Sequence, residues 1–229
     1  MIIYGKQIVL YALEHHSHRI CELYLAKDIE PKLFTKIKSC HKPILRLDSK
    51  KAQALARGGN HQGILARITP LESTPLASIK HYRKILVLCG ISDMGNIGGI
   101  FRSAYALGVQ AIIITQIKSP KIEQILRASS GAAFALPFCV VANTLDCINE
   151  LKMAGFSLYG ADMCGENVAR FTPAQKWALF LGDESQGLYD KIAKKLDKML
   201  SIQMHNGFDS LNVSVAAGIM MAYLDSNKG

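Results

Sequence analysis

The stretch SDMGNIGGIFRSAYALGV, which begins at residue 92, combines residue types that could serve a ligand. Gly95, Gly98 and Gly99 allow a backbone to approach a bound molecule closely, and the Asn96 side chain suits the cap of the helix that follows. Their GxxGG spacing differs from the GxGxxG of dinucleotide-binding loops, and no acidic residue ends the next strand, so a nicotinamide-dependent oxidoreductase is disfavoured. Within the helix, Arg102 either faces solvent or extends toward the same ligand.

Two further stretches carry polar residues at the start of a helix. In ALFLGDESQGLYDKI, from residue 178, Asp183 and Glu184 follow a buried strand. These acids either complement the positive end of the next helix or contact a polar group of a ligand. In DSLNVSVAAGIMMAYL, from residue 209, Ser210 could cap an apolar helix, but capping leaves Asn212 and Ser214 unexplained because both are poor interior helix residues. A helix start that faces a ligand would explain all three.

The elements around these stretches predict an α/β fold that brings them together. Near-continuous apolar strands alternate with helices from residue 85 onward, which indicates a mostly parallel sheet with helices on both faces. In such sheets ligands bind at the carboxyl ends of the strands, so we expect the chemistry just after residues 91, 182 and 204. The strands are expected at 85–91, 111–115, 138–142, 156–160, 177–182 and 198–204. The helices are expected at 97–107, 121–128, 144–154, 188–196 and 211–224.

A smaller α/β unit precedes this sheet. We expect it to form an N-terminal domain over 1–68, followed by a linker over 69–82 that carries two prolines and by a catalytic domain over 83–229. The net charge of +9 falls on residues 1–84, whereas acidic and basic residues balance over the remainder. This distribution indicates either a phosphate-binding module joined to a catalytic body or a basic surface that only aids solubility. Five of the seven histidines also precede residue 70, which favours RNA binding. Helices are expected at 5–16, 31–41 and 49–57, and strands at 19–26, 43–47 and 62–68.

Several other classes of protein are disfavoured by the sequence. None of the six cysteines forms a CxxC pair, and His15, His16 and His18 have no cysteine or carboxylate at a zinc-type spacing, so we expect neither a disulfide framework nor a metal site. No apolar run reaches membrane-spanning length, and the first residues lack the features of a signal peptide. We therefore expect a soluble cytoplasmic protein.

Taken together, three motifs resemble the SpoU (TrmH) family of S-adenosylmethionine-dependent RNA ribose 2′-O-methyltransferases. They are NIGGIFRSAYALG, LFLGDESQGL and IQMHNGFDSLNVSVAAGIMMAYL, in this order, and the resemblance covers about 85–229. More loosely, YGKQIVLYAL and NHQGILARI resemble the small L30e-like substrate-binding domain of the branch that methylates a guanosine ribose in 23S rRNA. The resemblance implies a C-terminal trefoil knot, S-adenosyl-L-methionine as methyl donor, and a homodimer through the catalytic domain.

The resemblance also assigns roles to individual residues. Arg102 would be the main catalytic residue, either taking the proton of the 2′-hydroxyl or stabilising the developing alkoxide; a free guanidinium has a pKa of about 12.5 or above, which argues against the first role. Glu184 would pair with Arg102. The other catalytic residues implied are Asn96, Ser210 and Asn212. The cofactor contacts, largely through the backbone, would fall on Leu181, Gly182, Ile202, Met204 and Leu211.

RNA is the expected partner, and cationic residues outside the motifs are expected to contact it. They are Lys32, Lys36, Arg46, Arg57 and, in the segment RASSGAAFALPF, Arg127. A tRNA ribose methyltransferase of the same family is an alternative, although its short members lack the first domain. A non-catalytic RNA-binding protein is a second alternative, disfavoured by the joint presence of the five catalytic candidates.

Overall fold

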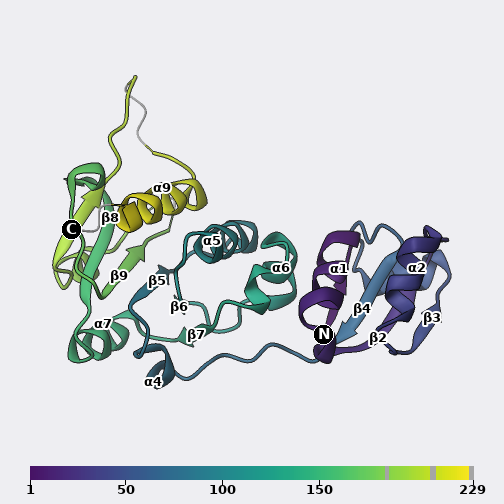
Figure 1. Cartoon of the computed structure of the whole chain (residues 1–229). Coiled ribbons are helices and arrows are strands. Elements are labelled where there is room, and N and C mark those ends of the chain that lie inside the picture. The colour runs from purple at the N-terminus through teal and green to yellow at the C-terminus, as the bar shows by residue number, and fades with distance from the viewer. Residues whose placement is uncertain (184–185, 207–209, 227–229) are drawn as a thin grey trace.

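The computed structural model describes residues 1–183, 186–206 and 210–226, which build two sheets joined by a linker (Figure 1). The first sheet has the strand order β1-β4-β2-β3, in which β4 is antiparallel to β1 and β2, and β3 is parallel to β2. Its strands are β1 (Ile2–Tyr4), β2 (Ile20–Leu25), β3 (Ile44–Arg46) and β4 (Ile64–Ile68). Its helices are α1 (Lys6–His15), η1 (Ser17–Arg19), α2 (Pro31–Lys38) and α3 (Ser49–Leu55).

The helices of this unit form where the apolar spacing predicts them. Ile8, Val9 and Ala12 of α1 are buried, which gives that helix one apolar face against the sheet. On α3, Ala52 is buried and packs with Tyr24 and Leu65 in a separate small core. Strand β1 was not predicted, because a strand of three residues is too short to show a periodicity.

The second sheet has six strands in the order β10-β8-β9-β5-β6-β7, and all of its pairings are parallel. Its strands are β5 (Lys84–Cys89), β6 (Ala111–Thr115), β7 (Phe138–Val141), β8 (Ser157–Asn167), β9 (Trp177–Leu181) and β10 (Lys198–Ser201). Its helices are α4 (Leu76–Ile79), α5 (Met94–Ala106), α6 (Ile122–Ala128), η2 (Ala132–Phe134), α7 (Thr144–Met153), η3 (Val168–Arg170), α8 (Asp190–Ala193) and α9 (Val213–Ser226).

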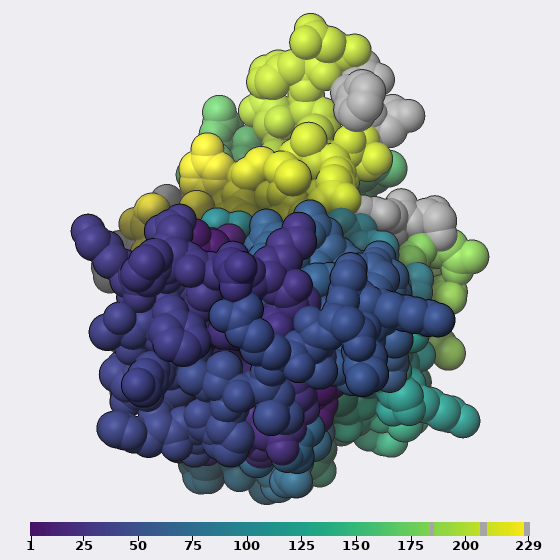
Figure 2. Space-filling view, turned by 90° about the vertical axis from the view of Figure 1, so that its right-hand side faces the viewer, coloured from purple at the N-terminus to yellow at the C-terminus, as the bar shows by residue number. Residues whose placement is uncertain are grey.

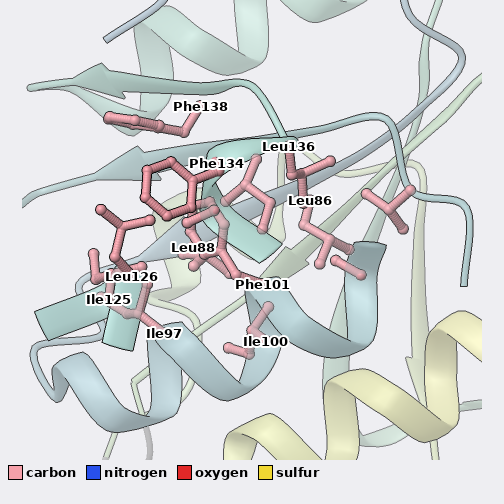
Figure 3. Close-up of a cluster of buried hydrophobic side chains, with 14 of the residues drawn as sticks. Leu86, Leu88, Ile97, Ile100, Phe101, Ile125, Leu126, Phe134, Leu136 and Phe138 are labelled. Atoms are coloured by element: carbon pink, nitrogen blue, oxygen red, sulfur yellow. The ribbon is translucent and has the colours of Figure 1, made fainter. Parts of the chain in front are cut away.

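Helices cover both faces of this sheet, as the near-continuous apolar strands predict. Alternate residues of β5 enter different cores: Leu86 and Leu88 pack with α5, α6 and α9, whereas Ile85 and Val87 pack with α4, α7 and α8. Figure 3 shows the first of these cores, in which Leu88 of β5 lies beside Phe101 of α5 and Phe134 of η2. Among the described residues, no helix is long and apolar enough to cross a membrane.

The predicted boundaries differ from the structure at several elements. Strand β8 continues to Asn167, seven residues beyond its expected end, and β10 ends at Ser201. The expected linker contains the short helix α4 and is fastened to the edge strand β7, where Thr74 N donates to Phe138 O (2.7 Å) and Val140 N donates to Ser73 Oγ (2.9 Å). These hydrogen bonds hold part of the linker against the large sheet.

The two units pack directly on each other. One buried apolar cluster runs from residues of α1 to residues of α6, and Figure 1 shows these two helices facing each other. His16 stacks on Phe134 with ring centroids 5.0 Å apart. Figure 2 looks onto the N-terminal unit, which covers this side of the molecule while the C-terminal segment rises beyond it.

The His16 contact predicts a pH dependence of stability. Its Nε2 is buried with no hydrogen-bond partner among the described residues, and burial, followed by the charges of His18 and Arg19, lowers the pKa of His16. The unfolded chain, in which the pKa of histidine is about 6.5, therefore binds the proton more readily, and the free energy of unfolding should fall as the pH drops below that value.

His16→Phe should remove this contribution while keeping a ring on Phe134. Urea denaturation of both proteins between neutral and mildly acidic pH should show the variant gaining stability relative to the wild type as the pH falls. A stability difference that stays constant with pH would contradict this role for His16.

Candidate active site

A cavity of about 370 Å³ lies at the carboxyl ends of β9 and β10. Its walls come from the segments that follow these strands, from β8 and from the first turns of α9, so three distant parts of the chain converge there. Its lining residues are Ala161, Asp162, Met163, Leu181, Gly182, Asp183, Gln186, Gly187, Ile202, Met204, Ser210, Leu211, Val213, Ala216 and Met220. Its position is that expected for a ligand site on a parallel sheet.

All five residues expected to contact a cofactor line this cavity. They are Leu181, Gly182, Ile202, Met204 and Leu211, together with the catalytic candidate Ser210. The walls are mostly apolar, with polar groups contributed by Asp162, Asp183 and Gln186. A cavity of this size and composition suits a small molecule with a planar apolar part and a few polar groups.

The main chain closes one side of the cavity at Gly182. A Cβ at this position would lie 2.1 Å from the carbonyl carbon of Gly187 and 2.5 Å from Leu188 N, which is closer than any side chain can come. Asp183 and Gly187 form a bridge there, in which Gly187 N donates to Asp183 O at 2.8 Å. Gly182 is therefore required by close packing of backbone on backbone.

The first turns of α5 and α9 meet beside the cavity through a polar network. Asn212 Nδ2 donates to Asn96 Oδ1 at 2.9 Å. Asn212 Oδ1 in turn accepts from Ser214 N at 2.9 Å and from Ser214 Oγ at 2.6 Å. Gly99 permits this approach, since a Cβ on it would lie 3.1 Å from Ser214 Cβ. Two of the predicted catalytic residues, Asn96 and Asn212, are thus brought together from positions far apart in the chain.

The helix caps differ from those expected. Asn212, and not Ser210, caps α9, because its side chain accepts from Ser214 N and α9 begins at Val213. Likewise Asp93 caps α5 by accepting from Asn96 N at 2.7 Å, so Asn96 lies inside the helix. The Asn96 side chain therefore does not cap α5, and its Oδ1 accepts a hydrogen bond from Asn212 instead.

Arg102 lies on the exposed surface of α5, beyond Asn96 on the same helix. It is not among the residues that line the cavity, and it has no hydrogen-bond or ion-pair partner within the described part of the chain. Its expected partner, Glu184, lies outside the described residues. The structure therefore gives Arg102 a place on the helix that carries Asn96, with its side chain accessible to a substrate.

The cationic residues expected to contact RNA all lie on the surface, and most have a partner. Lys36 pairs with Glu14, Arg46 with Asp28 at 2.6 Å, and Arg57 with Glu123 at 3.2 Å. Arg127 lies over the ring of Tyr4, with its Cζ 4.7 Å from the ring centroid, and Lys32 is exposed. Ion pairs this exposed are weak, so they leave these side chains available to phosphates.

Sequence reasoning missed one wall of the cavity. Ala161, Asp162 and Met163 line it, but they follow residue 160, where the predicted strand ends. Elsewhere, burial raises the pKa of Cys89 to about 12, so this thiol stays protonated at neutral pH and is unsuited to act as a nucleophile. No group of three His, Cys, Asp or Glu side chains arranged to hold a metal ion occurs in the described ranges.

The fold and the cavity define an α/β protein that binds a small molecule at the carboxyl edge of a parallel sheet. The model of the SpoU rRNA Methylase family matches residues 83–222, and a second family model, RNA 2′-O ribose methyltransferase substrate binding, matches residues 2–74. The chain belongs to the SpoU rRNA Methylase family.

Relatives of known activity align over nearly the whole chain. The chain is 28% identical to the 23S rRNA (guanosine-2′-O-)-methyltransferase RlmB of Neisseria meningitidis, with 96% of this chain and 92% of the relative covered. It is 30% identical to the RlmB of Pasteurella multocida, with 96% and 95% covered. A crystal structure of an AdoMet-bound rRNA methyltransferase from Sinorhizobium meliloti is 25% identical and superposes with a TM-score of 0.80 over 98% of this chain and 86% of that chain.

The Gly182 packing predicts the effect of one methyl group. Gly182→Ala should push the backbone at Gly182 away from that at Gly187 and Leu188, cost about 1–3 kcal/mol of stability and weaken the binding of S-adenosylmethionine at least about tenfold. Titration calorimetry, with thermal unfolding of the same samples, measures both effects. The matched control is Gly218→Ala on α9, where a Cβ would meet nothing closer than Ser103 Oγ at 3.8 Å. Equal cofactor affinity in the two variants would contradict the role of Gly182.

Proposed function

We propose that this protein is an enzyme that transfers a methyl group from S-adenosylmethionine to the ribose 2′-hydroxyl of a guanosine in 23S rRNA. The observation that carries the proposal is the cavity in which all five expected cofactor contacts converge beside the Asn96–Asn212 pair. The near full-length alignment with RlmB proteins supports the choice of rRNA over tRNA, because the alignment includes the N-terminal unit.

The residues of the cavity fit S-adenosylmethionine. The backbone contact at Gly182 and the apolar side chains of Leu181 and Ile202 would hold a flat heterocycle, and Asp162 and Asp183 offer carboxylates to hydroxyl or ammonium groups. Gly182, Ile202, Met204 and Leu211 would supply main-chain contacts. When bound, the cofactor supplies a methyl group on a sulfonium, which is already activated toward a nucleophile.

The protein's own residues would position the ribose and handle its proton. Asn96 and Asn212 orient each other and leave the ribose a fixed polar edge at the mouth of the cavity. Ser210 lines the cavity and would accept or relay the hydroxyl proton. Arg102 would stabilise the charge that develops on the attacking oxygen, a role that suits a guanidinium better than that of a base.

The N-terminal unit would bind the RNA substrate. We assign residues 1–68 to an L30e-like substrate-binding domain, 69–82 to a linker and 83–229 to the catalytic domain, a division that the two family matches support. Lys32, Lys36, Arg46 and Arg57 would contact phosphates and set the position of the RNA. The site of action would be the cytoplasm.

The catalytic domain would carry a trefoil knot and form a homodimer. The proposed knot would include the segments after β9 and β10 that close the cavity, and membership of the family supports it. For the homodimer, α9 and α5 present exposed apolar side chains on the surface: Val215 is 50% exposed, Tyr223 40% and Tyr105 49%. Burying such side chains against a second copy would remove them from water.

Two substitutions of Asn212 separate its structural role from its catalytic role. Asn212→Ser keeps an oxygen that can cap α9 but is too short to reach Asn96, so stability should change by only a few tenths of a kcal/mol. Asn212→Ala loses the cap as well and should cost about 1 kcal/mol. If Asn212 orients the substrate through Asn96, both variants should lose methyl transfer to a similar extent. If instead Asn212→Ser kept both its stability and its methyl transfer, while Asn212→Ala lost both, Asn212 would act only as a helix cap.

The activity itself is tested by nucleoside mass spectrometry of rRNA and tRNA from cells with and without the protein. Loss of one 2′-O-methylguanosine from 23S rRNA is expected, and its restoration by the wild-type gene but not by Arg102→Ala. The Arg102→Ala protein should fold and bind S-adenosylmethionine normally, because the side chain has no partner in the described part of the fold. If the missing methylation were confined to tRNA, the substrate would be tRNA and not 23S rRNA. If the Arg102→Ala protein were active, Arg102 would not have the proposed role.

A further inference from the structure

A second and larger cavity lies between the N-terminal unit and α6, away from the cofactor pocket. It has a volume of about 730 Å³, and we call it the α3–α6 cleft. The residues that matter to its chemistry are Tyr4, Arg57, Gly58, Glu123, Gln124 and Arg127. Arg57 faces the cleft from the N-terminal unit, whereas Glu123 and Arg127 face it from α6. The two arginines outnumber the one acid, which gives the cleft a positive charge. Its size and charge suit an anionic ligand with a flat apolar part.

Arg127 forms a stacking platform inside this region. Its guanidinium lies over the ring of Tyr4, and the ring in turn lies against Gly59, where a Cβ would come within 2.2 Å of Tyr4 Oη. Arg127 also lines a smaller neighbouring cavity of about 250 Å³, together with Asn60, Gln62 and Ser130. The guanidinium is exposed, so the face turned away from Tyr4 is available to a planar group. Nucleic-acid bases stack on arginine planes of this kind.

Arg57 provides an exchangeable contact on the other wall. Its Nη1 lies 3.2 Å from Glu123 Oε1, yet its side chain is 82% exposed, against 32% for Glu123. An ion pair that exposed contributes little, and a phosphate can replace the carboxylate on the same guanidinium. Gly58 beside it has open space where a side chain would stand. A backbone phosphate could therefore reach Arg57 without displacing packed atoms.

The cleft connects with the active site through α6. The C-terminal end of α6 packs on α5 so closely that a Cβ on Gly98 would lie 2.3 Å from Ala128 Cβ. Arg127 thus directly precedes a residue that touches the first turns of α5, two positions after Asn96. A strand that places one ribose at Asn96 would have its neighbouring nucleotides near Arg127.

We propose that the α3–α6 cleft binds an unpaired nucleotide of the RNA strand, close to the one that is methylated. Its base stacks on Arg127, which Tyr4 supports from behind, and its phosphate takes the place of Glu123 on Arg57. The inference rests on the proposed function for the identity of the strand, and it adds a binding site outside the catalytic residues. Because a base can enter only when it is unstacked, the cleft selects single-stranded segments over duplex.

The direction in which one substitution changes the RNA affinity separates this role from simple docking of the two units. Glu123→Gln releases Arg57 from its competing carboxylate, so the affinity for a short labelled single-stranded RNA should rise several-fold. If the Arg57–Glu123 pair serves only to hold the units together, the same substitution should loosen them and lower the affinity. Fluorescence anisotropy without cofactor measures this binding, and thermal unfolding reports the docking.

A second substitution tests the stacking platform. Arg127→Lys keeps the charge but removes the plane, and the Kd for the single-stranded RNA should rise about tenfold, the change typical of one lost stacked base. The affinity for an RNA duplex and the midpoint of thermal unfolding should not change. The matched control is Arg83→Lys, an exposed arginine just before β5, at the opposite end of the strands from the cavity.

The results distinguish this inference from the proposed function. The proposed role of the cleft would be overturned if Glu123→Gln bound RNA more weakly, or if Arg127→Lys behaved like Arg83→Lys. Neither result would affect methyl transfer by the wild-type protein. If the wild-type protein bound single-stranded RNA as described but methylated neither rRNA nor tRNA, the proposed function would be overturned. The inference that the cleft binds RNA would still hold.

Discussion

The close approach of α5 and α9 is the constraint on which the candidate site depends. Gly99 permits the contact between the two helices, because a Cβ on it would lie 3.1 Å from Ser214 Cβ. Because the helices share this contact, the Asn212 side chain can bond Asn96 across it. The same placement turns Val213, Ala216 and Met220 of α9 toward the cavity. One helix pair thus sets both the polar edge and one wall of the site.

Much of the large sheet could be predicted from the sequence, because strands buried on both faces read as unbroken apolar runs. Strand β8 shows where this signal ends. Its second half, ADMCGEN from residue 161, is polar and largely exposed, so local pattern favours a loop. Strand β10 pairs with β8 at Tyr159 and Gly160 and again at Glu166 and Asn167, because the register shifts between Met199 and Leu200. Residues 161–163 lie between these two sets of partners. Pairing between distant segments leaves no local signal, and this wall was missed for that reason.

The polar residues of the site show a similar limit. Each helix start offers several side-chain oxygens within three residues, and any of them could cap the helix. Asp93 caps α5 and Asn212 caps α9, and the Asn96 side chain instead accepts a hydrogen bond from Asn212 across the two helices. The cofactor contacts were predicted from the family resemblance, which carries information about tertiary structure that periodicity lacks. Arg102 was located on its helix by sequence, whereas the partner that we propose for it is a substrate outside the chain.

The attachment of the linker to β7 has a consequence for the reach of the N-terminal unit. Thr69 is held by Arg19 O at 2.9 Å, and Ser73 and Thr74 are held on the edge of the sheet. The chain between Thr69 and Ser73 can extend over at most about 14 Å, so the N-terminal unit is confined to a short radius around its docked position. The same hydrogen bonds occupy the outer edge of β7, which protects the sheet from adding strands of other chains and so from aggregation.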